Sequence, residues 1–280
     1  MTVASGLADL AALARNEPGL QEVLGRSGAV LAVPESARPV IVAALTHATT
    51  RSPVVVAVPT GTMAQQLADD LAAFLDPSDI AVFPAWETLP FERVSPDVHT
   101  MGERMKVLWR LRTEGQAPRV IVAGTRALLQ KLAPGAAAVE PITVTKGGRV
   151  DADRLCEELV RFGYRRENVV EHRGEFARRG AIIDIFPSTD DEPVRIDLWG
   201  DDVDRLTRFA VAEQRSTADI DAALVFPARE LIYDDAMRQR ARALVAAEPW
   251  GREHWERLTE GQVFDGMESW MPWLSAPRVA

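Results

Sequence analysis

Cysteine and lysine are almost absent from this 280-residue sequence, which has a single cysteine, Cys156, and three lysines. One cysteine excludes an internal disulfide framework and fits a reducing cytoplasm. The four histidines, at positions 47, 99, 172 and 254, lie far apart, so we expect no zinc site and no other metal site. No apolar run approaches the roughly 18 residues of a membrane span, and the N-terminus lacks the apolar core of a signal peptide. We therefore expect no membrane partner.

The net charge is −9, and nearly all of the positive charge is arginine. This balance excludes a protein that coats nucleic acid with its whole surface. A site for nucleic acid or for an acidic partner must be a local basic patch.

Strands and helices alternate in the first half of the sequence. Apolar runs predict strands at 28–33, 53–58, 80–83 and 119–123, and amphipathic segments predict helices at 40–48, 62–75, 100–112 and 125–132. Continuous apolar strands separated by helices are typical of a parallel sheet that is covered on both faces. We therefore predict an α/β domain.

The loop after the first predicted strand stands where such domains usually bind phosphate. It consists of Pro34, Glu35, Ser36, Ala37, Arg38 and Pro39. A Walker A loop needs glycines for close approach of the backbone and a Lys-Ser/Thr pair for phosphates and magnesium. No Gly-Lys dipeptide occurs in the chain, Glu35 adds a negative charge, and two prolines remove amide donors. The loop is a degenerate phosphate loop, and we expect no cofactor and no catalytic residue.

The pattern changes near residue 134. A helix is predicted at 151–161, with Leu155, Leu159 and Val160 pointing inward, followed by alternating strands at 180–186, 194–199 and 204–209. This is the pattern of a small antiparallel α+β unit inserted into the α/β chain. Asp184 lies in one of these strands, and its alternation with isoleucines predicts an outward-facing residue rather than a metal ligand. Helices follow at 234–247 and 250–258.

The segment from Arg161 to Gly180, called the arginine segment below, carries six arginines against three glutamates. Arg165, Arg166, Arg173, Arg178 and Arg179 surround Phe176 within it. Arginine with an interleaved aromatic is typical of a protein-binding hot spot or a nucleic-acid contact. A solvated hairpin that neutralises itself is the alternative.

Two stretches give the chain a family resemblance. FPAWETLPFERVSPDVHTMGERMKVLWRL, at 83–111, resembles the signature of the bacterial transcription-repair coupling factors, Mfd. GYRRENVVEHRGEFARRGAIIDIFPSTDDEPVRIDLWGDDVDRLTRFAVAEQRS, at 163–216, resembles the second domain that Mfd shares with the excision-repair helicase UvrB. The resemblance covers about residues 20–275.

The resemblance implies a degenerate RecA/helicase-like parallel-sheet domain, 1a plus 1b, with an inserted antiparallel domain 2. The implied borders are 1–127 for domain 1a, 128–217 for domain 2 and 218–280 for domain 1b. In the family, domain 2 docks the damage-recognition ATPase UvrA. The resemblance implies that the parent protein is an ATP-dependent translocase of the bacterial cytoplasm. It would bind RNA polymerase and DNA with parts that are absent from this chain.

The UvrB pattern Tyr-x-Arg followed by Arg-Gly-x-Phe-x-x-Arg-Gly falls on Tyr164, Arg166, Arg173, Phe176 and Arg179. The resemblance assigns UvrA contacts to Arg166 and Arg179, apolar support to Phe176, and auxiliary roles to Arg165, Arg173 and Arg178. The expected function is a non-catalytic adaptor in nucleotide-excision repair. A DNA-binding module that uses the same arginines and a helicase-like ATPase of UvrB type stay open as alternatives.

Overall fold

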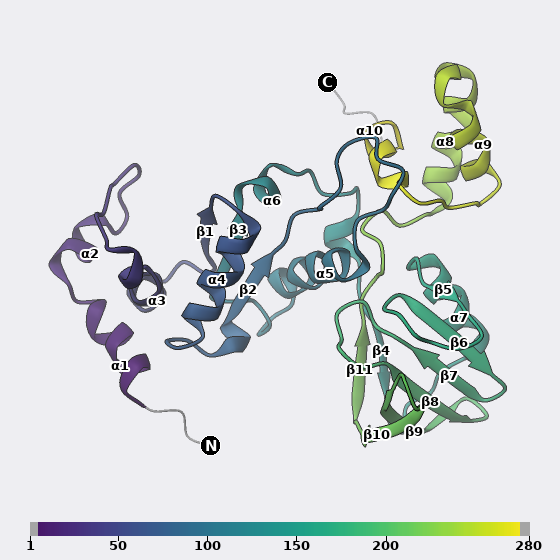
Figure 1. The fold of residues 1–280 in the computed structure, drawn as a ribbon, viewed down its shortest axis with the longest axis horizontal. Helices are drawn as coiled ribbons and strands as arrows, with labels where there is room; N and C mark the ends of the chain where they lie inside the picture. The colour runs from purple at the N-terminus through teal and green to yellow at the C-terminus, as the bar shows by residue number, and fades with distance from the viewer. Residues whose placement is uncertain (1–4, 275–280) are drawn as a thin grey trace. The chain divides into compact units, whose positions relative to one another are not determined.

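The computed structural model describes residues 5–274 (Figure 1). They form two compact units: one runs up to Ala85 and includes Arg110–Lys131, and the other comprises Trp86–Trp109 and the chain from Leu132 onward. None of the helices within residues 5–274 has the length and apolar character that a bilayer crossing requires.

The first unit contains a three-stranded parallel sheet with the strand order β1-β3-β2. Its elements are α1 (Ser5–Ala14), α2 (Pro18–Val23), the 3-10 turn η1 (Glu35–Ala37), α3 (Arg38–Ala48), β1 (Val54–Val58), α4 (Gly61–Leu71), η2 (Pro77–Asp79), β2 (Ile80–Phe83), β3 (Val120–Gly124) and α6 (Thr125–Leu129). Buried alanines, leucines and valines of α1, α3, α4 and β3 form its core. The predicted parallel α/β layer is confirmed.

Two expectations for this unit are wrong. Residues 28–33 form no strand, and Val30 is 92% exposed. The sheet is also not covered on both faces along β1, where Val55 and Ala57 are exposed between half-buried neighbours. An apolar run marks a strand only where a neighbouring strand completes its hydrogen bonds. Residues 28–33 have no such neighbour.

The second unit contains the antiparallel sheets. Six strands follow the order β10-β9-β8-β7-β6-β5, and β11 pairs with β4 in a separate two-stranded sheet. The elements are α5 (Val98–Arg112), which begins in this unit, η3 (Ala136–Ala138), β4 (Ile142–Thr145), α7 (Ala152–Arg161), β5 (Arg165–Arg166), β6 (Glu175–Arg179), β7 (Ile182–Ile185), β8 (Val194–Trp199), β9 (Asp202–Ala210), β10 (Arg215–Asp219), β11 (Ala222–Val225), α8 (Asp235–Ala247), η4 (Pro249–Gly251), α9 (Arg252–Thr259), η5 (Met267–Trp270) and α10 (Met271–Leu274).

Two main cores hold this unit together. One joins α7 to the inner side of β6–β9 and to the β4–β11 pair, and the other joins α8 and α9 to the turns that follow them. Leu155 and Leu159 enter the first core as predicted, but Val160 is 55% exposed, so its predicted inward orientation is wrong. Together, the parallel sheet and the separate antiparallel sheets are consistent with a helicase-like α/β fragment plus a small domain.

Candidate partner-docking surface

The arginine segment forms one edge of the six-stranded sheet. Edge strand β5 contributes Arg165 and Arg166, and it runs parallel to β6. The amides of Arg165 and Glu167 donate to the carbonyls of Gly174 and Phe176, at 2.8 Å each. The segment is therefore not the hairpin of the alternative interpretation, because the antiparallel partner of β6 is β7.

Strand alternation divides the arginines between the two faces of the sheet. Arg166 is in register with Phe176, and that side of the sheet, called the helix face below, packs against α7. Arg165 is in register with Glu175 on the opposite side, called the outer face. Arg178 then belongs to the helix face and Arg179 to the outer face.

A buried ion-pair cluster occupies the outer face. Asp184 is 1% exposed and accepts from Arg195 through both oxygens, at 2.7 and 2.9 Å. Arg179 donates to the same carboxylate at 2.5 Å and is 46% exposed. The prediction that Asp184 points outward to solvent is wrong. Asp184 does leave the α7 core, but two guanidinium groups and neighbouring side chains enclose it, so its charge is buried and paired.

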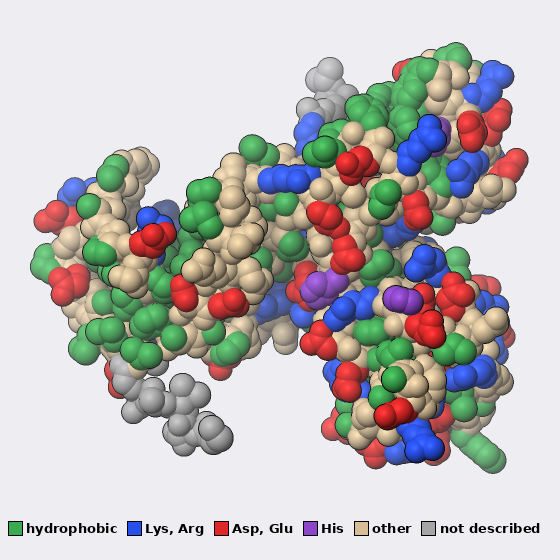
Figure 2. Space-filling model, viewed as in Figure 1, with side chains coloured by type: hydrophobic (Ala, Val, Ile, Leu, Met, Phe, Trp, Pro, Cys, Tyr) green, Lys and Arg blue, Asp and Glu red, His purple; other side chains and the backbone are tan. Residues whose placement is uncertain are grey.

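Two other arginines of the segment are held by neighbouring loops and helices. Arg173 donates to the carbonyl of Asp190 at 2.7 Å and to the carboxylate of Asp191 at 2.6 Å. Arg178 forms an ion pair with Asp153 in the first turn of α7. These contacts anchor the surrounding segments and agree with the alternative interpretation, in which the charges neutralise one another. Figure 2 shows acidic and basic side chains interspersed on the visible side of this sheet.

Phe176 is fully buried in the core between the sheet and α7. The expectation that it supplies apolar support to a partner is therefore wrong, because no part of its ring is accessible. Tyr164 is also internal: its hydroxyl donates to the Phe226 carbonyl at 2.7 Å and accepts from the Ser188 amide at 3.0 Å. Burial raises the pKa of this phenol. The aromatic residues of the pattern thus stabilise the fold that presents the arginines.

Arg166 differs from the other four arginines. It is exposed, and within residues 5–274 no hydrogen bond or ion pair engages its side chain. It lies near Cys156 of α7, where burial raises the pKa of the thiol while the charges of Arg178 and Arg166 oppose that rise. Arg166 can therefore pair with a partner without breaking an existing contact.

Arg165 has only a loose internal partner. Its guanidinium is 3.6 Å from the carboxylate of Glu175, and its side chain is 69% exposed. Burial raises the pKa of Glu175, but the amides of Glu171 and His172, together with the charges of His172 and Arg165, lower it by more than burial raises it. The net pKa lies below the ordinary value, and Glu175 is an anion at neutral pH.

The degenerate phosphate loop is in the first unit. Its residues form the turn η1 and the start of α3. The amide of Ala37 donates to the carbonyl of Pro34 at 3.0 Å, and Arg38 forms an ion pair with Glu35 at 3.1 Å. Glu35, Arg38 and Asp70 line a pocket of about 110 Å³ beside it. Two carboxylates against one already paired arginine disfavour a bound phosphate.

Comparison with known proteins finds a family that matches the region containing the arginine segment. The UvrB interaction domain family matches residues 142–231, a range that contains the whole six-stranded sheet and the arginine segment. The chain is 36% identical over 288 residues to transcription-repair-coupling factors of Mycobacterium bovis and Mycobacterium tuberculosis, covering 96% of this chain and 23% of each relative. It is 30% identical over 228 residues to the Escherichia coli factor, covering 79% of this chain and 19% of the relative.

These matches support an N-terminal UvrB-homology module of a transcription-repair-coupling factor. The module spans less than a quarter of the length of these relatives. The family that matches is named for an interaction. Sequence reasoning missed Asp184 and Asp153 as partners of Arg179 and Arg178, and Arg195 as the second partner of Asp184. Only the strand register, which the sequence does not specify, brings them together.

Proposed function

We propose that this module is a non-catalytic adaptor that recruits UvrA, with Arg166 as the main contact and Arg179 as the second. The observation that carries the proposal is an exposed arginine on the sheet edge that is unengaged among the described residues, within the region matched by the UvrB interaction domain. Arg165, Arg173 and Arg178 have auxiliary roles.

Docking would use side chains rather than an added strand. Edge strand β5 has only two residues, and very short edge strands disfavour pairing with another chain. Arg166 and Arg179 belong to opposite faces, so a partner must reach around the edge to contact both. Planar guanidinium groups suit bidentate pairing with carboxylates, and we expect acidic side chains on UvrA there.

A calorimetric titration of the module with UvrA tests the proposal. Truncating one partner of a desolvated charge pair costs about 2 to 5 kcal/mol, so Arg166→Ala should weaken binding by roughly 30-fold or more. Arg179→Ala should weaken it less than that, since part of its charge already serves Asp184. The fold should survive both changes, because Asp184 keeps Arg195.

Arg205→Ala is the matched control. Arg205 is an exposed arginine of β9 in the same sheet, paired with Asp219 at 3.0 Å and remote from β5 in the strand order. Its loss should change the affinity little, because exposed ion pairs contribute about 0 to 1 kcal/mol. Unchanged affinity in Arg166→Ala, or tight binding to UvrB in place of UvrA, would refute the assignment.

We further propose that the module hydrolyses no ATP and that DNA and RNA polymerase bind other parts of the parent protein. The engaged amides and the Arg38–Glu35 pair of the phosphate loop support the absence of ATP hydrolysis. In thermal-shift titrations up to millimolar Mg-ATP, Arg38→Ala and the unaltered chain should respond alike, and neither should release phosphate from ATP. A saturable shift that Arg38→Ala removes would contradict this proposal. The division into domains 1a, 2 and 1b at residues 127 and 217 is also part of the proposal.

A further inference from the structure

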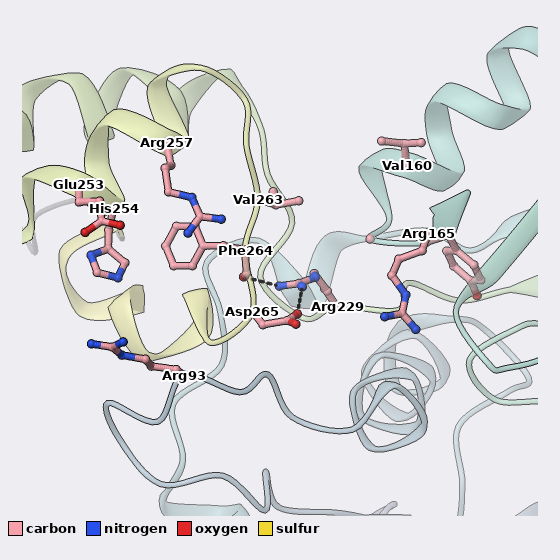
Figure 3. A pocket seen from close by; sticks show the side chains of 12 residues that line it. Arg93, Val160, Arg165, Arg229, Glu253, His254, Arg257, Val263, Phe264 and Asp265 are labelled. Atoms are coloured by element: carbon pink, nitrogen blue, oxygen red, sulfur yellow. Dashed lines mark hydrogen bonds and ion pairs between the residues drawn. The ribbon is translucent and has the colours of Figure 1, made fainter. Parts of the chain in front are cut away.

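One pocket lies within the second unit. It has a volume of about 580 Å³ and is lined by Arg93, Arg165, Arg229, His254, Arg257 and Phe264, among others. Figure 3 shows Arg93, His254 and Arg257 gathered with Phe264 at one end, Arg165 at the other, and Arg229 between them. A volume of this size can hold a nucleotide-sized ligand.

Two of these arginines have no ionic partner. Within residues 5–274, neither Arg93 nor Arg257 forms an ion pair or a side-chain hydrogen bond. Arg257 lies over the ring of Phe264, 4.6 Å from its centroid, which orients its guanidinium at the pocket. The pocket thus presents two positive charges whose counter-ions are not supplied by the described chain.

The remaining charges hold the wall of the pocket in place. Arg229 pairs with Asp265 at 3.1 Å and with the buried Glu268 at 3.0 Å, so it is fixed and largely neutralised. A Cβ atom on Gly163, which has a φ of +86°, would lie 2.7 Å from Cγ of Arg229, so the backbone of domain 2 packs directly on this side chain. Of the two described carboxylates that line the pocket, Asp265 pairs with Arg229 and Glu253 forms no ion pair with an arginine. The balance of the pocket remains positive.

We propose that this pocket binds a phosphate group, held by Arg93 and Arg257 and reached from the other end by Arg165. Arginines that come from the link before α5, from α9 and from β5 converge on one space. A phosphate offers more acceptor oxygens than a carboxylate and can satisfy guanidinium groups from several directions. The phosphate can belong to a free nucleotide-like compound or to a single nucleic-acid strand, and the second source would overturn the proposal that DNA binds only other parts of the parent protein.

His254 provides a reporter inside the site. Burial lowers its pKa, and the charges of Arg257 and Arg93 lower it further, against the opposing charge of Glu253. A phosphate bound between the arginines would offset their charge and raise this pKa. The ring also lies 5.1 Å from that of Phe264, so its NMR signals respond to any change there.

The experiment follows the His254 ring signals by NMR while the intact chain is titrated in separate arms with inorganic pyrophosphate and with a short oligothymidylate. We expect saturable binding and a raised His254 pKa in at least one arm. Arg257→Ala should weaken that binding about tenfold, since it removes a charge-assisted contact. Arg252→Ala is the control, because Arg252 lies on the same helix, outside the pocket, 3.9 Å from Glu256.

The arms distinguish the two sources of phosphate. Tighter binding of the oligonucleotide, with a salt slope that falls by about one unit in Arg257→Ala, identifies a nucleic-acid strand. Tighter binding of pyrophosphate identifies a small phosphorylated compound. If Arg257→Ala does not fold, Arg93→Ala in the link before α5 gives the same test. The proposal is overturned if neither probe moves His254, if Arg252→Ala weakens binding equally, or if an oligoglutamate binds more tightly than both probes.

Discussion

Phe176 separates a structural role from a binding role within the arginine segment. Its ring is fully buried among side chains of α7, β7 and β8, so Phe176→Ala should lower the free energy of unfolding by about 3 to 5 kcal/mol. Urea denaturation measures this loss. Arg166→Ala, by contrast, should stay within about 0.5 kcal/mol, because it removes an exposed side chain without a partner. Normal stability of Phe176→Ala would show that the ring is not in the core.

Glu175 makes stability depend on pH. Its pKa lies below its ordinary value of 4.5, so its carboxylate stabilises the fold above that pH, and this contribution is lost as the pH falls through the lowered folded-state pKa. At neutral pH, Glu175→Gln should therefore lower the free energy of unfolding by about 1 kcal/mol, because the amides of Glu171 and His172 lose a charged acceptor.

The difference in the free energy of unfolding between wild type and Glu175→Gln should shrink as the pH falls below 4.5. Chemical denaturation at several pH values measures it. Glu171→Gln is the control, because that side chain is exposed. A difference that stays constant across the acid range would contradict the assignment.

For single residues, the sequence predicts which side chains take part in a site better than it predicts the face of the sheet on which each side chain lies. The arginine-rich composition and the family pattern pointed to a segment that forms one edge of the six-stranded sheet. They could not place Arg166 and Arg179 on different faces, since that depends on a parallel β5–β6 register and a single shift reverses every side chain. Asp184 was misread for a related reason: a strand residue that points away from one core can be buried by a second set of neighbours.

Two glycines test how tightly the elements around β5 are packed. Gly174 and Gly180 both have positive φ, +80° and +64°. A Cβ on Gly180 would meet nothing within 4 Å, whereas one on Gly174 would lie 3.1 Å from Cγ1 of Val98. Gly180→Ala should lower the free energy of unfolding by about 1 to 2 kcal/mol through backbone strain alone.

Gly174→Ala should cost about 1 kcal/mol more than Gly180→Ala, because overpacking adds to the same strain. Thermal unfolding of both variants gives the comparison. Equal losses would mean that Val98 moves aside freely and that α5 is not packed closely on this turn.

Elements with a strong local pattern were predicted well. The strand at 80–83 has the predicted bounds, and the helix at 152–161 begins within one residue of its prediction. The prediction of a strand at 28–33 was wrong because an apolar sequence carries no information about a partner strand. The 13-residue helix α8 begins within one residue of the helix predicted at 234–247, and the side chain of its N-cap, Asp234, accepts from the Met237 amide at 2.7 Å, a local contact that stabilises this start.

For the whole molecule, the central question is whether the arginine surface depends on the rest of the chain. Every buried residue of the core between α7 and the sheet lies between Val144 and Ala228. The UvrB interaction domain match covers 142–231, which includes all of them. The contacts this range makes with other segments are peripheral to that core, such as Val98 and the Arg104–Glu230 pair.

A chain of residues 142–231 should therefore fold alone, with dispersed amide signals in NMR spectra and a cooperative unfolding transition. Glu230 would lose Arg104 but would lie at an exposed chain end, where an unpaired carboxylate is hydrated and costs little. If UvrA docks as proposed, this chain should bind it within about a factor of three of the full sequence, a difference of about 0.6 kcal/mol. A folded fragment without affinity would place the contact outside the arginine edge, whereas an unfolded fragment would show that the segment 86–109 completes the domain.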